Sequence, residues 1–183
     1  MTDGELARVL DDHLAAEFQH LDLDATMATM TADPYLNHVP VMTGGIGRDE
    51  VREFYGGFFI GHWPADTTTE QISRTVGADH VVDELVMSFT HDMVMNAVLP
   101  GVPPTGRRVR LAVCVVAGFA DGKLTHEHIY WDQASLLVQV GLLDPAGLPV
   151  LGAEQAEKLL APRAIPANAL LGEAWANRPK PGE

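Results

Sequence analysis

The sequence is poor in cysteine and in basic residues. Cys114 is the only cysteine among 183 residues, so no disulfide can form within the chain. The 12 Lys+Arg stand against 25 Asp+Glu, which leaves a formal net charge of −13. This acidic balance argues against nucleic acid and anionic membranes as partners, because both require a basic binding surface.

Long apolar runs are also missing. No segment approaches the roughly 18 consecutive apolar residues of a membrane-spanning helix. Residues 1–5 have neither the basic start nor the apolar stretch of a signal peptide. The expectation is therefore a cytoplasmic protein. Cys114 lies within the apolar run at residues 111–116, which predicts a core residue rather than a nucleophile.

The first third of the chain has helical periodicity. Leu6, Val9, Leu10, Leu14 and Phe18 recur at helical spacing, which predicts an amphipathic helix over residues 5–18 with the acidic residues, Glu17 among them, mostly on other faces. The sequence further predicts a short helix beginning at Asp24, a strand over residues 35–42 and a third helix from Asp49.

From residue 67 onward the period changes from helical to two. Strands are predicted over residues 67–76, 80–95, 109–120 and 123–131, the last two joined by the hairpin turn Asp121-Gly122. Helices followed by an antiparallel meander form the α+β pattern. The long strands are apolar on both parities, so both faces of the sheet need cover. Because the helices cover one face, the C-terminal segment or a second subunit must cover the other, and we expect a homodimer.

The C-terminal segment differs in composition from the rest. Residues 144–183 are rich in proline, alanine and glycine, with helical stretches at residues 154–160 and near 169–175. This segment is too short to be a domain, so we expect a single domain over residues 1–143 and an extension over 144–183 that wraps the domain or a partner subunit. The composition of residues 132–143 is compatible with a short helix and with a bent strand.

The densest polar cluster lies on the last predicted strand. Side chains alternate along a strand, so one face receives His126, His128, Tyr130 and Asp132, and the other Glu127, Ile129 and Trp131. A carboxylate buried in an apolar pocket acquires a raised pKa and becomes a usable proton acceptor or donor. Asp132 is therefore the candidate acid/base residue. The alternatives are that it caps a following helix or is merely solvated.

Further candidates are scattered along the chain. His38 and His91 interrupt or follow apolar strands, and the aromatic residues Tyr35, Phe54 and Phe58 are expected to wall a cavity between helix and sheet. His126 and His128 are two residues apart on one strand face, which is also the spacing of a metal-binding pair. A third ligand would have to come from His38, His91 or Glu84, and the metal question stays open.

The order of elements resembles a known fold. A helix, a short helix, a strand with a glycine-rich turn, a third helix and a meander resemble the cone-shaped nuclear transport factor 2-like fold. The motifs that carry the resemblance lie at residues 44–51 (GGIGRDEV), 103–107 (PPTGR), 121–124 (DGKL), 131–132 (WD) and 139–143 (QVGLL). Together they look like a SnoaL-like polyketide cyclase relative over residues 5–143. The resemblance implies N-terminal helices packed on a curved antiparallel sheet.

The resemblance also implies a reaction class. In the cyclases an Asp near the end of the last long strand moves the proton in an intramolecular aldol closure, and Asp132 occupies that position. We therefore expect a cofactor-independent aldol cyclase, isomerase or related lyase or hydrolase acting on a hydrophobic carbonyl or lactone-like molecule. The alternative is a non-catalytic ligand-binding or dimerisation module of the same fold.

Each candidate residue receives a role in this hypothesis. Asp132 moves the proton, and His128 or Tyr130 donates a hydrogen bond to the developing oxyanion. No metal or cofactor is assigned. The expected substrate-binding residues are Tyr35, His38, Phe54, Phe58, His91 and Tyr130. An exposed Asp132 bonded only to the backbone amides near Ser135 would favour the capping alternative.

Overall fold

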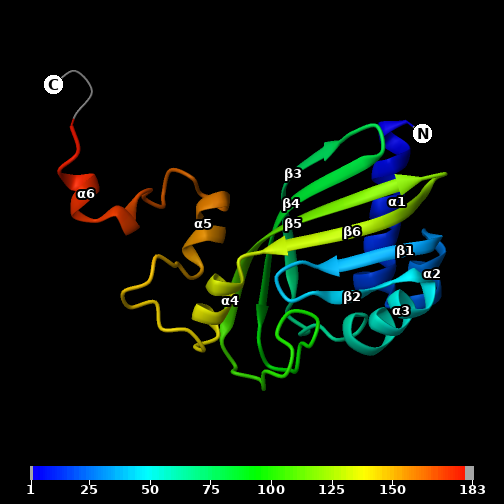
Figure 1. Cartoon of the computed structure of the whole chain (residues 1–183), viewed down its shortest axis with the longest axis horizontal. Helices are drawn as coiled ribbons and strands as arrows, with labels where there is room; N and C mark the ends of the chain where they lie inside the picture. The colour runs from blue at the N-terminus through cyan, green and yellow to red at the C-terminus, as the bar shows by residue number, and fades with distance from the viewer. Residues whose placement is uncertain (1, 180–183) are drawn as a thin grey trace.

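The computed structural model describes residues 2–179 as a mixed α+β fold (Figure 1). The N-terminal part comprises α1 (Asp3–Ala15), the π-helical turn η1 (Ala16–His20), α2 (Leu23–Ala28), β1 (Met30–His38), β2 (Thr43–Ile46), α3 (Gly47–Phe54) and a second π-helical turn η2 (Tyr55–Phe59). The long strands are β3 (Thr68–Val76), β4 (His80–Thr90), β5 (Arg108–Ala120) and β6 (Lys123–Trp131). They are followed by α4 (Gln133–Gln139), α5 (Glu154–Leu160), the 3-10 turn η3 (Ala169–Leu171) and α6 (Glu173–Ala176).

The six strands form one curved sheet in the order β2-β1-β6-β5-β4-β3. The meander β3 to β6 is antiparallel throughout, as predicted, and Asp121 and Gly122 turn β5 into β6 with positive φ angles of 49° and 80°. Only β1 departs from this pattern, since it pairs parallel to β6. The sheet is thus mainly antiparallel and open, with β2 and β3 at its edges and the parallel pair β1–β6 between them.

Several boundaries differ from those predicted; β4, for example, ends at Thr90 and not at residue 95. The second helix begins earlier because Asp22, not Asp24, is its N-cap and accepts a hydrogen bond from the backbone N–H of Ala25 (3.0 Å). The first strand begins at Met30 and runs through Asp33 and Pro34. Its pairing with β6 shifts register between Met30 and Tyr35, because Pro34 has no N–H to donate to a ladder.

The N-terminal helices pack against one face of the sheet, which we call the inner face (Figure 1). Helix α1 contacts β3, β4 and β6, and α3 contacts β1 and β2. Fully buried residues from both layers form the core, among them Leu10, Met27, Val51, Phe89 and Leu124. The structure therefore has the predicted arrangement of helices on a curved sheet. Within residues 2–179 no helix combines the length and apolar character that a bilayer crossing needs.

The C-terminal extension begins on the opposite, outer face. Helix α5 contacts β4 and β5, and the Ser135 hydroxyl of α4 donates a hydrogen bond to the carbonyl oxygen of Gly152 (2.7 Å). Beyond α5 the chain leads away from the sheet through η3 and α6 (Figure 1), and Leu170, Leu171 and Trp175 are exposed there. The extension thus covers part of its own sheet. The homodimer and the domain boundary at residue 143 stay predictions.

Candidate functional site

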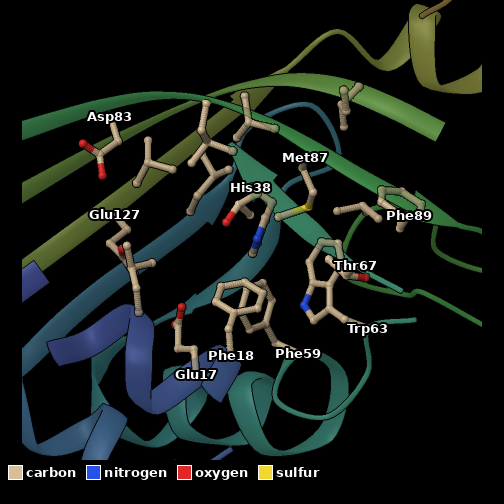
Figure 2. Close-up of a pocket in the computed structure, with 18 of the residues that line it drawn as sticks. Glu17, Phe18, His38, Phe59, Trp63, Thr67, Asp83, Met87, Phe89 and Glu127 are labelled. Carbon is tan, nitrogen blue, oxygen red and sulfur yellow. The ribbon is translucent and has the colours of Figure 1, made fainter. Parts of the chain in front are cut away.

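A cavity of about 680 Å³ lies between the N-terminal helices and the inner face of the sheet (Figure 2). Its volume is within the range of small-molecule binding sites. Most of the lining is apolar and comes from η1, η2, the following loop and strands β4, β5 and β6: Phe18, Phe59, Trp63, Leu85, Met87, Phe89, Leu111, Val113, Val115, Ile129 and Trp131. A small set of polar side chains interrupts this wall.

Glu17 of this wall and His13 directly behind it come from neighbouring turns at the end of the first helix. Leu6, Leu10, His13 and Glu17 follow one another at spacings of four, three and four residues, so they form one buried stripe. At Ala16 the helix widens into the π-helical turn η1, a distortion that occurs often at functional sites. The stripe thereby brings a histidine and a carboxylate to the sheet.

The third polar group comes from the last strand. Glu127 lies on the inner face of β6 with Ile129 and Trp131, and it is buried. His13 Nε2 lies 3.0 Å from Glu17 Oε1 and 3.1 Å from Glu127 Oε2. The hydroxyl of Tyr55, from η2, donates a hydrogen bond to the same Glu127 oxygen at 2.9 Å. One imidazole thus stands between two buried carboxylates; we call His13, Glu17, Glu127 and Tyr55 the carboxylate cluster.

The other ring nitrogen of His13 fixes where its proton lies. Nδ1 is 2.6 Å from the Thr29 hydroxyl oxygen, and that hydroxyl donates its own proton to the carbonyl oxygen of Thr26 (2.7 Å). Thr29 therefore accepts from Nδ1–H. A neutral His13 would present an unprotonated Nε2 to two carboxylates, whereas an imidazolium donates to them.

The electrostatics follow from this contact. Burial opposes a charge on His13, but Glu17 and Glu127 outweigh it and hold the pKa of His13 well above its usual value. Burial raises the pKa of Glu17, partly offset by His13. For Glu127 burial acts the same way, but His13 and the Tyr55 hydroxyl prevail and lower its pKa. The pKa values of the two carboxyl groups are therefore shifted in opposite directions, which is typical of an acid/base pair.

Glu17 is also the incompletely satisfied member. Despite its ion contact with His13, no hydrogen bond of acceptable geometry reaches Glu17 Oε1 from the described residues. Figure 2 shows the Glu17 carboxylate beside Phe18, directed toward the cavity. Ligand atoms of His13, Glu17 and Glu127 also lie within 4.8 Å of one another, so a divalent cation and a proton would compete for this place.

His38 is a further ionisable group on the cavity wall, which also contains Asp11, Arg74 and Asp83 besides members of the carboxylate cluster. It is buried at the end of β1, where its ring packs against Phe54, Phe59 and Trp131. Burial lowers the pKa of His38 to about 4, so the ring is neutral at physiological pH. Nδ1 donates to the Thr43 carbonyl oxygen (3.3 Å). This leaves Nε2 as a hydrogen-bond acceptor.

Asp132 does not lie in this cavity. It is exposed, and its Oδ1 accepts hydrogen bonds from the backbone N–H groups of Ala134 (2.9 Å) and Ser135 (3.2 Å) as the N-cap of α4. Its Oδ2 accepts from the side-chain amide of Gln155 at 2.6 Å. The expectation of a buried pocket acid at this position is wrong, because the helices cover the other parity of β6. The geometry matches the capping alternative.

His128 and Tyr130 alternate with the same period as Asp132, so their side chains also point away from the cavity. Both lie on the outer face of β6, where the His128 ring is 5.3 Å from that of Tyr35 in an edge-on contact. Tyr130 and Tyr35 are exposed, and none of the three lines the cavity. The alternation along β6 was predicted, but the covered face is the one that contains Glu127.

The remaining predicted binding residues have mixed positions. Of the six, only His38 lines the cavity. Phe54 is a core residue behind His38, and Phe58 is exposed at the turn η2. His91 is buried just past β4, where Nδ1 contacts the Thr105 hydroxyl at 3.1 Å. These residues support the wall or the adjoining loop, and they do not face the cavity.

The comparisons with known proteins agree with this fold. The family model described as a SnoaL-like domain matches residues 11–127. The chain belongs to the SnoaL-like family. The matched segment contains all four members of the carboxylate cluster and His38, and it ends before Asp132. No curated protein sequence matches the chain.

Solved structures share the SnoaL-like architecture at low sequence identity. AclR from Streptomyces galilaeus, a hydroxylase candidate, is 22% identical with a TM-score of 0.60 over 78% of this chain and 100% of its own. A SnoaL-like polyketide cyclase candidate from Jannaschia sp. CCS1 is 18% identical, with a TM-score of 0.62 over 77% and 94%. SalBIII, an epoxide hydrolase/cyclase-like enzyme of salinomycin pyran ring formation, is 16% identical, with a TM-score of 0.51 over 70% and 92%. These likenesses establish the fold.

Sequence reasoning missed the ionisable residues of this SnoaL-like cavity. Glu17 was assigned to a polar face, although it continues the spacing of Leu6, Leu10 and His13. Glu127 was noted only as the neighbour of a polar cluster, although it shares the apolar parity of Ile129 and Trp131. In both places the usable signal is a single carboxylate within an otherwise apolar stripe.

Proposed function

We propose that this SnoaL-like protein is an acid/base enzyme for a hydrophobic carbonyl or lactone-like small molecule, with Glu17 as the residue that exchanges the proton. The observation that carries the proposal is the pair Glu17 and Glu127 on either side of His13 at the wall of an apolar cavity. Burial makes Glu17 the weaker acid of the two. A carboxyl group with a raised pKa is suited to accept and return protons near neutrality.

Glu127, His13 and Glu17 have different charge states in this scheme. Glu127 keeps its negative charge because His13 and the Tyr55 hydroxyl both donate to it. His13 is thereby held as an imidazolium, which adjoins Glu17 at 3.0 Å. Tyr55 and His13 are positioning residues in this scheme. They orient Glu17 electrostatically and do not themselves contact the substrate.

The proton step is written for a substrate with a carbon acid beside a carbonyl. The Glu17 carboxylate takes the proton, and the C–H electron pair moves to the carbonyl oxygen to form an enolate. In an isomerisation Glu17 returns the proton to another atom of the enolate. In an aldol cyclisation the enolate carbon attacks a second carbonyl of the same molecule, and Glu17 gives the proton to the new alkoxide. Either sequence leaves the enzyme unchanged.

Other cavity groups bind and shield the substrate. The indole N–H of Trp63 has no acceptor among the described residues, so it is available to a substrate oxygen. His38 offers Nε2 to a substrate hydroxyl. Figure 2 shows the rings of Phe18 and Phe59 beside Glu17, with Trp63 beyond them near Phe89. Such walls exclude water, which strengthens electrostatic interactions inside the cavity.

The test uses proton exchange, because it needs no knowledge of the final product. A panel of hydrophobic ketones and β-keto lactones is incubated with the protein in D₂O, and deuterium uptake beside the carbonyl is followed by NMR. We expect uptake with the wild type and a loss of about 10²- to 10⁴-fold with Glu17→Gln. Asp132→Asn is the matched control and should exchange at the wild-type rate.

Two outcomes would overturn the assignment. Exchange that survives Glu17→Gln but disappears with Asp132→Asn would return the role to the N-cap residue. Binding of panel members without exchange by any form of the protein would favour the non-catalytic ligand-binding module. Circular dichroism of each variant establishes that the fold is intact, so a loss of exchange is not mistaken for unfolding.

A further inference from the structure

A row of histidines crosses the outer face of the sheet, away from the cavity. The His126 ring lies between two others, with ring centres 5.4 Å from His80 and 4.7 Å from His128. The proposed function uses none of the three, and none lines the cavity. We propose that His80, His126 and His128 bind one divalent transition-metal ion, such as Zn²⁺, on this face.

The strand register explains why the row exists. His80 of β4 is paired with Gly118 of β5, and Gly118 is paired with His126 of β6. The middle position therefore has no side chain. A Cβ on Gly118 would lie 2.1 Å from Cε1 and 2.8 Å from Nε2 of His126. The ring of His126 thus occupies the space over the glycine and reaches toward His80 on the next strand.

The spacing of the rings suits a shared ion. Zinc binds imidazole nitrogen at about 2.0–2.1 Å with tetrahedral geometry, which places the centres of two coordinated rings about 5 Å apart. The two separations in the row, 4.7 Å and 5.4 Å, bracket this value. Imidazole ligands favour zinc, copper, nickel and cobalt over magnesium or calcium. The ligand chemistry is therefore that of a borderline transition metal.

Neighbouring side chains contact one ring nitrogen in two of the three histidines. His80 Nδ1 contacts the Asp79 carboxylate at 2.7 Å, and His126 Nδ1 contacts the Thr125 hydroxyl at 3.0 Å. An acceptor on one ring nitrogen leaves the other free to bind a metal, as in the carboxylate–histidine–zinc arrangement.

Closure of the site requires the histidine side chains to turn toward one another. Ring nitrogens of the row do not yet meet within the 4.8 Å that His13, Glu17 and Glu127 achieve among the described residues. The side chain of His80 is 44% exposed, so its ring is free to rotate toward His126. The site is open to solvent, and an ion reaches it without passing through the cavity.

The test is a titration of tag-free protein with Co²⁺, followed by its visible absorption, and with Zn²⁺ by calorimetry. We expect one ion per chain with an absorption band typical of imidazole ligands. His126→Gln should remove the band, and Asp79→Asn should raise the Kd about tenfold or more. His20→Gln, which removes an exposed histidine outside the row, is the matched control and should bind normally.

Further variants separate this site from the carboxylate cluster. Glu17→Gln should leave Co²⁺ binding unchanged, because Glu17 lies on the other side of the sheet. Gly118→Ala should weaken binding by displacing the His126 ring, with the fold checked by circular dichroism. The proposal is overturned if the wild type binds neither ion, if His126→Gln binds as well as the wild type, or if only Glu17→Gln abolishes binding. His126→Gln should exchange deuterium at the wild-type rate. A loss of metal binding can therefore be distinguished from a failure of the proposed function.

Discussion

Glu17 Oε1 lies 3.0 Å from His13 Nε2, one helical turn further along the chain and at the start of a π-helical widening. This contact links two groups whose protonation depends on each other. His13 keeps its proton because the carboxylates are close, and Glu17 is a weak acid because it is buried. The stability and the chemistry of the protein should therefore respond to pH through the same cluster.

The first prediction concerns stability in alkaline solution. The pKa of His13 is higher in the folded than in the unfolded chain, so its contribution is complete below about pH 6.5 and is lost as the pH rises through the folded value. Glu17 acts in the same sense, and Glu127 is ionised in both states above about pH 6.5. The free energy of unfolding in urea should therefore fall as the pH rises above about 6.5.

His13→Gln is the comparison for this prediction. The variant should be less stable by about 3–5 kcal/mol at neutral pH, because it leaves a buried carboxylate without its partner. Its stability should also change less over the alkaline range than that of the wild type. Parallel slopes for both proteins would show that His13 does not carry the pH dependence.

The second prediction concerns the hydroxyl of Tyr55. Tyr55→Phe removes the donor to Glu127 Oε2 and keeps the ring. We expect a loss of about 1–3 kcal/mol at neutral pH, measured by urea unfolding. The pKa of Glu127 should rise, since this hydroxyl helps to lower it. The difference from the wild type should therefore shrink in acid, where Glu127 is protonated in both proteins. The exposed Tyr130→Phe serves as control and should unfold like the wild type.

The third prediction separates capping from catalysis at Asp132. Asp132→Ala removes the acceptor of the Ala134 and Ser135 N–H groups and should cost about 1 kcal/mol. Asp132→Asn keeps a good N-cap and should be nearly as stable as the wild type. Thermal unfolding of the two variants measures this difference. Equal stability of the alanine and asparagine variants would contradict the capping role.

The fourth prediction concerns the protonation of His38. Burial lowers its pKa to about 4, so NMR of ¹⁵N-labelled protein should show a neutral ring with the proton on Nδ1 at neutral pH. The resonances should titrate only near about pH 4. The unfolded chain binds this proton more readily, so stability falls as the pH drops from about 6.5 toward that value. A midpoint near about pH 6.5 would mean that the ring is solvated.

Local patterns predicted most of the fold. The turn at Asp121-Gly122 requires two positive φ angles, and both residue types tolerate them. The helix at residues 154–160 was predicted with the bounds that α5 has. The parallel pairing of β1 with β6 was not predicted, because the residues of β1 do not determine which distant strand lies beside them.

The site was harder to predict because it depends on which face is covered. Alternation places Glu127 and His128 on opposite faces of β6 whatever the tertiary structure. The helices decide which of the two faces becomes the interior, and that decision involves residues throughout α1 and α3. The four polar residues on one face of the last strand predicted a site there. The chemically unusual residues are instead the single carboxylates among apolar neighbours.

His13 and Glu127 are separated by 114 positions in the chain. Synthesis at about 5–20 residues per second therefore leaves the first helix on the ribosome for roughly ten seconds before its partner strand is made. During that interval His13 has no contact with Glu127, and Glu17 is the only carboxylate of the cluster that has been made. A chain that ends before β6 therefore has a first helix whose polar stripe, His13 and Glu17, lacks its partner strand.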